Sequence, residues 1–367
     1  MSRLSLIAIC FLSTCPPAAL LAEEKKIADR TQSEWIKILR TDEKARMREG
    51  AVVALSLIGP KERGVIEAFR EAMLNDKAER VRLKAVTLAG DFDKDLLRSL
   101  IQPLAEVLTS DKSATVRTAA ARALGRTGEY AKTATNAIID GLKDSDPVVR
   151  AAVAEAIGRI GEEAKGAVPQ LIALLKDGDA NVRLAAVFAL GRVGPVAAKA
   201  VPELSTVLAA DADATVRKEA ARAFGFLGFE AKEGVPALAK SLREDKADDV
   251  RQHAALALGK MGLDVKPAIP ALLDAMRKDA DKAVRIYSVT ALGNSLGSRL
   301  KDYVADLADL LIKEPEGDVR LAIVQELGAL GPNAKDALPA LNRAVADVQI
   351  TVRDAAKAAV KKVMAKP

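Results

Sequence analysis

The chain has 367 residues, and half of them are hydrophobic but only 3% are aromatic. A single compact core is not expected at this length, so several domains or an elongated stack of closely packed helices is favoured. The 56 Lys and Arg residues exceed the 50 Asp and Glu residues by a formal charge of only +6, which is weak support for nucleic-acid binding.

The first 22 residues have the layout of a secretory signal peptide. Arg3 precedes an apolar run from Leu4 to Leu12, and small residues lead to Ala22 before charged residues begin. We therefore expect cleavage near Ala22 and export to the periplasm or the extracellular space. Two alternatives stay open: an N-terminal membrane anchor, for which the run is short, and lipidation at Cys15, where the preceding residues resemble a lipobox.

Both cysteines, Cys10 and Cys15, lie in this leader. The mature chain is therefore expected to contain no disulfide and no cysteine chemistry. No later stretch is long and apolar enough to cross a membrane, so we expect a mature chain without a transmembrane segment.

From Thr31 onward one pattern recurs: an acid, an Arg six residues later, and apolar positions that usually end in Leu-Gly. Ten arginines fit it without exception, at intervals of 33 to 35 residues, and we number the repeats one to ten after them. Such regular self-similarity predicts an array of stacked units. These ladder arginines are Arg48, Arg82, Arg117, Arg150, Arg183, Arg217, Arg251, Arg285, Arg320 and Arg353. The acids are Asp42, Asp76, Asp111, Asp144, Asp177, Asp211, Asp245, Asp279, Glu314 and Asp347.

Residues 167–194 show what each unit should look like. A Pro-led apolar segment from Val168 to Leu175 predicts a first helix, and the segment from Val182 to Val193 predicts a second. Gly191 and Gly194 are both expected to end the second helix, because a positive φ costs glycine little. A helix hairpin cannot bury its apolar face alone, so it must stack on its neighbours.

The two ends of the array differ from its middle. Thr31 and Glu34 form a capping-box pattern that predicts the start of the first helix. In the last repeat, Lys357 occupies a position that holds Val or Ala in every other repeat, and Lys361 replaces the glycine of the Leu-Gly pair, so we expect no further repeat. No linker interrupts the pattern, and residues 23–367 are expected to form a single domain.

The motif Asp-x-Asp-x-x-Val-Arg, seen at Asp211 to Arg217, resembles the HEAT repeat family, in the short form also found in phycobilisome lyase-like proteins. The tetratricopeptide and ankyrin signatures, which have a similar period, are absent. The resemblance covers roughly nine tenths of the chain. It implies an all-α, right-handed superhelix, or α-solenoid, of about ten antiparallel helix pairs, with the second helices on the concave side.

The resemblance also implies that the acids and arginines form a ladder within and between repeats, so that Arg217 should bond acids such as Asp211. Their occurrence in every unit fits a structural role better than ten catalytic acids. The single histidine, His253, has no second histidine to complete a metal site, and neither a nucleophile–histidine pair nor a phosphate-binding loop is present. We therefore expect no catalytic residue, no metal and no cofactor.

The positions one, five and nine residues after each ladder arginine, here called the groove positions, should face the concave side. In repeats three to seven they mix cations with apolar residues, which suits an acidic protein segment that carries apolar anchors. An alternative is that Arg126, Arg159 and Arg192 merely neutralise helix C-termini. The predicted binding residues are Arg122, Arg126, Arg159, Leu184, Phe188, Arg192, Arg222, Phe226, Leu256 and Lys260.

The function that these observations favour is that of a non-enzymatic, exported scaffold or adaptor that holds a protein partner. One alternative is nucleic-acid binding, as in HEAT-like DNA glycosylases, but it would need a strong basic stripe and more aromatic residues. The other is an accessory subunit of an exported enzyme. The repeats do not specify an oligomeric state.

Overall fold

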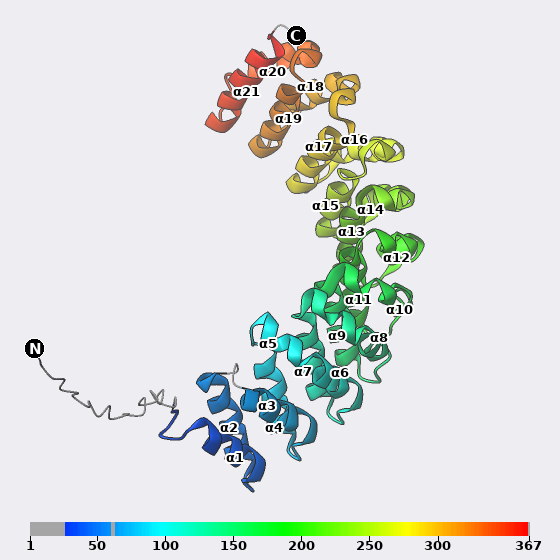
Figure 1. The fold of residues 1–367 in the computed structure, drawn as a ribbon. Helices are drawn as coiled ribbons and strands as arrows, with labels where there is room; N and C mark the ends of the chain where they lie inside the picture. Colours follow the sequence, from blue (N-terminus) through cyan, green and yellow to red (C-terminus); the bar gives the residue numbers. More distant parts are fainter. Residues whose placement is uncertain (1–25, 60–62, 366–367) are drawn as a thin grey trace, which may run out of the picture.

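The computed structural model describes residues 26–59 and 63–365, and the predicted signal peptide lies outside them. The described chain is built of helices and contains no strand, only an isolated bridge between Ile27 and Arg30. Its hairpins stack into a curved α-solenoid, with the N-terminal repeats at one end of an arc and the C-terminal repeats at the other (Figure 1). None of the helices in the described ranges has the length and hydropathy of a bilayer-spanning segment.

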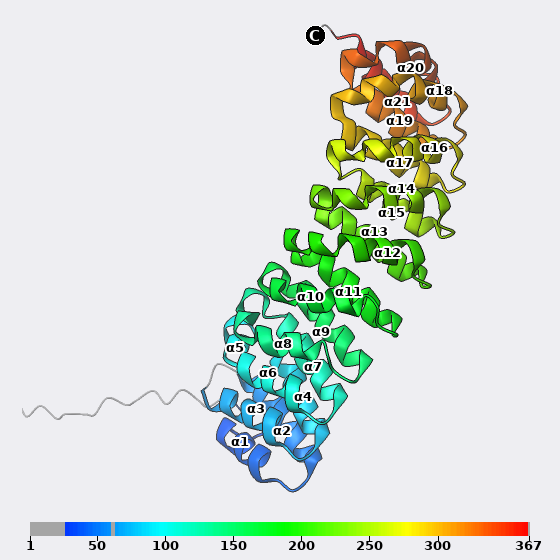
Figure 2. The ribbon, with the colours of Figure 1, turned by 90° about the vertical axis from the view of Figure 1, so that its right-hand side faces the viewer.

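Ten first helices form the outer layer of the arc, and Figure 2 shows the stack with this convex side turned to the viewer. They are α1 Gln32–Thr41, α3 Arg63–Asn75, α6 Ile101–Ser110, α8 Thr135–Gly141, α10 Val168–Leu174, α12 Val201–Ala210, α14 Val235–Glu244, α16 Ile269–Lys278, α18 Val304–Lys313 and α20 Leu338–Ala344.

Ten second helices form the inner, concave layer, where each packs against the second helix of the next repeat (Figure 1). They are α2 Ala45–Ile58, α4 Glu79–Ala89, α7 Ala114–Gly125, α9 Pro147–Ile160, α11 Ala180–Val193, α13 Ala214–Leu227, α15 Asp248–Leu258, α17 Lys282–Leu296, α19 Gly317–Ala329 and α21 Ile350–Val363. The all-α solenoid that the repeat pattern predicted is confirmed.

Helices α1 and α10 begin where the sequence predicted them, whereas α11 begins at Ala180, before the predicted Val182. Thr31 caps α1 through a complete capping box, in which the backbone N–H of Thr31 donates to Glu34 Oε2 at 2.8 Å. Proline occupies the first turn of α10, α12, α14 and α16, where its missing N–H has no intrahelical partner to lose. Short 3₁₀ helices connect most successive hairpins, a detail that the periodicity did not predict. They are η1 Gly128–Ala134, η2 Gly161–Ala167, η3 Pro195–Ala200, η4 Gly228–Gly234, η5 Gly262–Ala268, η6 Gly297–Tyr303 and η7 Gly331–Ala337.

The two glycines that close a unit have different roles. Gly194 ends α11 with φ near 97°, as predicted. The prediction that Gly191 also ends the helix is wrong, because α11 continues to Val193. A Cβ placed on Gly191 would lie 3.1 Å from Ala223 Cα in α13, so the absence of a side chain lets successive second helices approach closely.

The second repeat departs most from the others. Its second helix, α4, ends at Ala89, and Gly90 is the C-cap residue. The segment that leads to the next repeat forms a separate short helix, α5 Lys94–Ser99, in place of a 3₁₀ helix. Asp93 starts α5 by accepting the backbone N–H of Leu96.

Candidate protein-binding groove

The ladder arginines link each repeat to the next. Arg183 donates from Nε and Nη2 to the two carboxylate oxygens of Asp211, at 2.7 and 2.9 Å, and from Nη1 to the carbonyl oxygen of Asp177 at 2.9 Å. Asp211 also accepts the backbone N–H of Asp213. One guanidinium thus joins the turn of its own repeat to the turn of the following repeat.

Repeats one to nine share this arrangement, with a carboxylate partner in the next repeat. The expected bond between Arg217 and Asp211 therefore needs a correction: Arg217 pairs with the carboxylate of Asp245, and Asp211 offers it only a backbone carbonyl. Arg353 of the last repeat donates to the carbonyls of Asp347 and Val348. The ladder is therefore a structural link between repeats.

Electrostatics keep these buried acids ionised. Burial alone would raise the pKa of Asp211, but the bonds from Arg183 and from the Asp213 N–H hold that pKa below its usual range. Asp245 is held low in the same way by Arg217 and the Ala247 N–H. The ladder acids that pair with an arginine of the preceding repeat are therefore held in the charged form by the stack itself.

The groove positions of repeats three to seven lie on the concave side, and they differ in exposure. Phe226 is 41% exposed and Leu256 is also exposed, whereas Leu184 and Phe188 are half-buried. The ring of Phe188 lies over Gly158 of the preceding second helix, where a Cβ would collide with it. Phe188 therefore serves packing as well as the surface, and Phe226 is the more accessible of the two rings.

Three cations surround the ring of Phe226. Arg192, Arg222 and Lys260 place their charged groups 5.6, 5.2 and 5.7 Å from its centroid, and they come from three successive repeats. Such contacts hold long cationic side chains against an aromatic face. We call these four residues the Phe226 cluster. It brings together cations and an exposed aromatic ring within the predicted binding set.

Glu219 lies beneath this cluster, and the sequence analysis did not single it out. One of its oxygens is 3.4 Å from Arg222 Nη1, and the other is buried with no hydrogen-bond partner. Burial raises the pKa of Glu219, and Arg222 opposes this only in part. The available signal was an acid two residues after a ladder arginine, at a position that holds alanine in repeats three to five.

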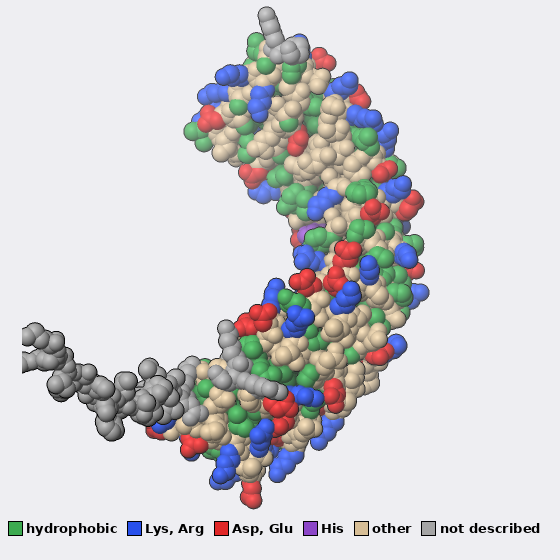
Figure 3. Space-filling model, in the orientation of Figure 1, with side chains coloured by type: hydrophobic (Ala, Val, Ile, Leu, Met, Phe, Trp, Pro, Cys, Tyr) green, Lys and Arg blue, Asp and Glu red, His purple; other side chains and the backbone are tan. Residues whose placement is uncertain are grey.

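The remaining cations of the predicted set lie along the same surface. Arg122 and Arg159 are exposed and have no acidic partner among the described residues, whereas Arg126 pairs with Asp91 at 2.8 Å. Figure 3 shows Lys and Arg side chains along the concave edge, with apolar and acidic side chains among them. Some of the groove cations, such as Arg122 and Arg159, nevertheless have no ion-pair partner among the described residues.

No metal site accompanies these residues. Within residues 26–59 and 63–365 no three His, Cys, Asp or Glu side chains are grouped so that they could hold an ion. His253 lies close to the backbone of Asp249, with its Nδ1 2.8 Å from that carbonyl oxygen.

The family follows from the repeat itself. A sequence profile described as HEAT repeats matches residues 33–125, 101–168, 135–225, 168–259, 201–279 and 269–361, and the chain belongs to the HEAT repeat family. This match does not single out the phycobilisome lyase-like form. No curated protein sequence matches the chain.

Among solved structures the chain is similar to importin β and to Kap121p. Importin β in a polyethylene glycol condition superposes with a TM-score of 0.64 at 15% identity, covering 90% of this chain and 54% of that one. Kap121p bound to Pho4p gives 0.56 at 15% identity, covering 90% and 41%. The chain thus spans about half the length of the importin β chain and 41% of the Kap121p chain. At this level of identity the similarity shows the fold alone.

Proposed function

We propose that the protein is a non-enzymatic scaffold whose concave face binds an acidic protein segment with apolar anchors. The observation that carries this proposal is the Phe226 cluster, where an exposed ring lies among three cations. Exposed aromatic rings and arginines are the residues that most often dominate binding energy in interfaces. The solved complex of the similar solenoid Kap121p with Pho4p supports the general mode, in which a solenoid holds a protein.

Acidic partners are favoured because some exposed cations of the groove have no ion-pair partner. Arg122 and Arg159 have no acidic partner in the described chain, and Arg222 has only a long contact with Glu219, at 3.4 Å. A bound carboxylate would pair with such cations, while apolar side chains would cover Phe226 and Leu256. The cations would speed the encounter, and the association rate should fall as salt rises.

An array of acidic 15-residue peptides, with and without apolar residues, tests this proposal. Phe226→Ala should weaken the best peptides by about five- to thirtyfold, as expected for loss of about 1–2 kcal/mol at an interface centre. Phe229→Ala is the matched control, because Phe229 is also exposed but lies in η4, outside the groove positions. Equal binding by the two variants would refute the groove. Tighter binding of single-stranded DNA than of any peptide would favour the nucleic-acid alternative.

We further propose that the protein is exported after cleavage near Ala22, a proposal that rests on the leader pattern of residues 1–22. N-terminal sequencing of the native protein tests it. A mature chain starting near Glu23 supports export, and a chain that retains Ser2 refutes it.

A further inference from the structure

A hollow opens on the concave side between α4 and α7, at the N-terminal end of the predicted groove. Its volume is about 490 Å³, within the range of ligand sites in proteins. In repeat five the Phe188 ring covers Gly158, but here the corresponding positions hold Arg122 and Gly90. An arginine thus occupies the position that holds a ring in repeat five.

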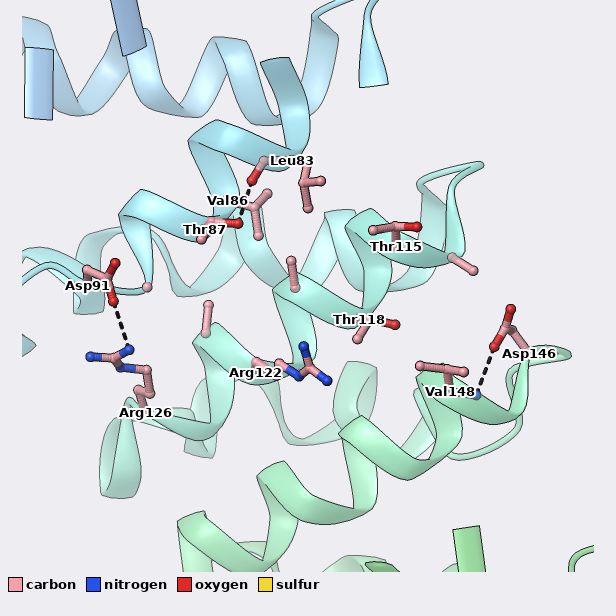
Figure 4. Close-up of a pocket in the computed structure, with 14 residues that line it drawn as sticks. Leu83, Val86, Thr87, Asp91, Thr115, Thr118, Arg122, Arg126, Asp146 and Val148 are labelled. Atoms are coloured by element: carbon pink, nitrogen blue, oxygen red, sulfur yellow. Dashed lines mark hydrogen bonds and ion pairs between the residues drawn. The ribbon is translucent and has the colours of Figure 1, made fainter. Parts of the chain in front are cut away.

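The lining is apolar with few polar groups. Leu83 and Val86 of α4 face Ala119 and Ala123 of α7, and Val148 of α9 stands exposed at the rim. Figure 4 shows α4 side chains opposite those of α7, with a pair of hydrogen-bonded groups at each end of the hollow. An apolar side chain of a ligand would therefore find an apolar surface here.

Most of the charged groups around the hollow are already engaged. Asp91 pairs with Arg126, and Asp146 accepts the backbone N–H of Val148 at the start of α9. Arg122 has no partner among the described residues, and its guanidinium can donate several hydrogen bonds. Thr118 is only 6% exposed, and its hydroxyl is buried without a hydrogen-bond partner. The hollow thus holds one available cation and one unsatisfied hydroxyl beside apolar walls.

We propose that this hollow binds the carboxyl-terminal residue of a peptide, with an apolar side chain against Leu83 and Ala119 and the terminal carboxylate on Arg122. A C-terminal residue carries its side chain and its carboxylate on one carbon, so both can be satisfied within a short distance. In an internal segment the carboxylate and the apolar side chain belong to different residues, so the two groups lie farther apart. This inference rests on the proposed function, because the peptide would continue from the hollow along the groove of repeats three to seven.

Fluorescence anisotropy with two labelled acidic octapeptides tests the proposal. Both end in leucine, one with a free carboxylate and one with an amide. Wild-type protein should bind the free acid about ten- to a hundredfold more tightly, the effect of one charge-assisted bond. Arg122→Gln should remove this preference, and Thr87→Trp, which places a large side chain at the exposed edge of the hollow, should do the same.

Arg159→Gln is the matched control, because Arg159 is an exposed groove cation outside the hollow. It should weaken both peptides and preserve their ratio. Equal binding of the two peptides to wild type, with both weakened by Phe226→Ala, would overturn the terminal site and leave the groove standing. No binding of either peptide would overturn the terminal site, while the peptide array would still judge the groove. Displacement of the free acid by octanoate at equal concentration would also overturn it, by making a simple carboxylate a sufficient ligand.

Discussion

Arg217 and Arg222 lie in one helix and carry the same charge, yet their removal should have different consequences. The side chain of Arg217 is 15% exposed and that of its partner Asp245 only 7%. The side chain of Arg222 is 48% exposed, and its contact with Glu219 is long. Arg217→Ala should therefore destabilise the protein far more than Arg222→Ala.

The structure sets the size of this difference. Arg217→Ala removes two bonds to Asp245 and one to the Asp211 carbonyl, and it leaves a buried carboxylate without its cation. Breaking a buried pair in this way costs about 3 kcal/mol, the low end of the usual range, because Asp245 keeps the Ala247 N–H. Arg222→Ala removes an exposed, weak contact and should cost about 0.5 kcal/mol.

Urea melts followed by circular dichroism measure both losses. Because solenoids can unfold in segments, hydrogen exchange of α13 and α15 should accompany the melts. The double variant Arg217→Ala/Asp245→Ala should lose less than the sum of its single changes, since it strands no charge. Equal losses in Arg217→Ala and Arg222→Ala would contradict the assignment of one arginine to the ladder and the other to the groove.

Two further predictions concern single positions. Burial raises the pKa of Glu326 to about 7, so the folded state holds a proton that the unfolded state releases near pH 4.5, and stability falls as pH rises between these values. Glu326→Gln should therefore be more stable than wild type above pH 7, by about 1–2 kcal/mol once screening by solvent is taken into account. Thermal melts at several pH values measure this difference. Equal stability of the variant and wild type at every pH would contradict the prediction. A Cβ on Gly125 would lie 2.8 Å from Ala156 Cα, whereas a Cβ on Gly50 would meet nothing within 4 Å. Gly125→Ala should cost about 1–3 kcal/mol and Gly50→Ala should gain about 0.5–1 kcal/mol; thermal melts that shift in the same direction would refute the close approach of α7 and α9.

Much of the fold could be predicted because the same pattern of residue types recurs in all ten repeats. A single hairpin such as residues 167–194 is ambiguous by itself, but ten copies place the same residue types at the same helical positions. Local chemistry then determined the helix starts, as the Thr31 capping box shows. The role of Gly191 could not be read from its own helix, because the constraint comes from Ala223 in the next repeat.

The ladder and the groove illustrate the same difference between local and long-range information. Spacing paired Arg217 with the acid six residues before it, but the side chain reaches 28 residues ahead to Asp245, because stacking brings that turn closer than sequence suggests. Periodicity correctly placed Phe226 among exposed positions. It could not distinguish this ring from Phe188, since the exposure of Phe188 depends on Gly158 in a neighbouring helix.

The arginines of the second helices therefore divide by their partners. A ladder arginine such as Arg183 bonds a carboxylate of the next repeat and a carbonyl of its own, and its side chain is only 16% exposed. Arg122 in α7 and Arg159 in α9 each lie a few residues after the ladder arginine of their own helix. They have no acidic partner in the described chain. The first kind stabilises the stack, whereas the second adds charge to its surface without stabilising it. Binding and stability should for this reason be separable by mutation, and the separation would fail only if the groove cations were needed to hold the repeats together.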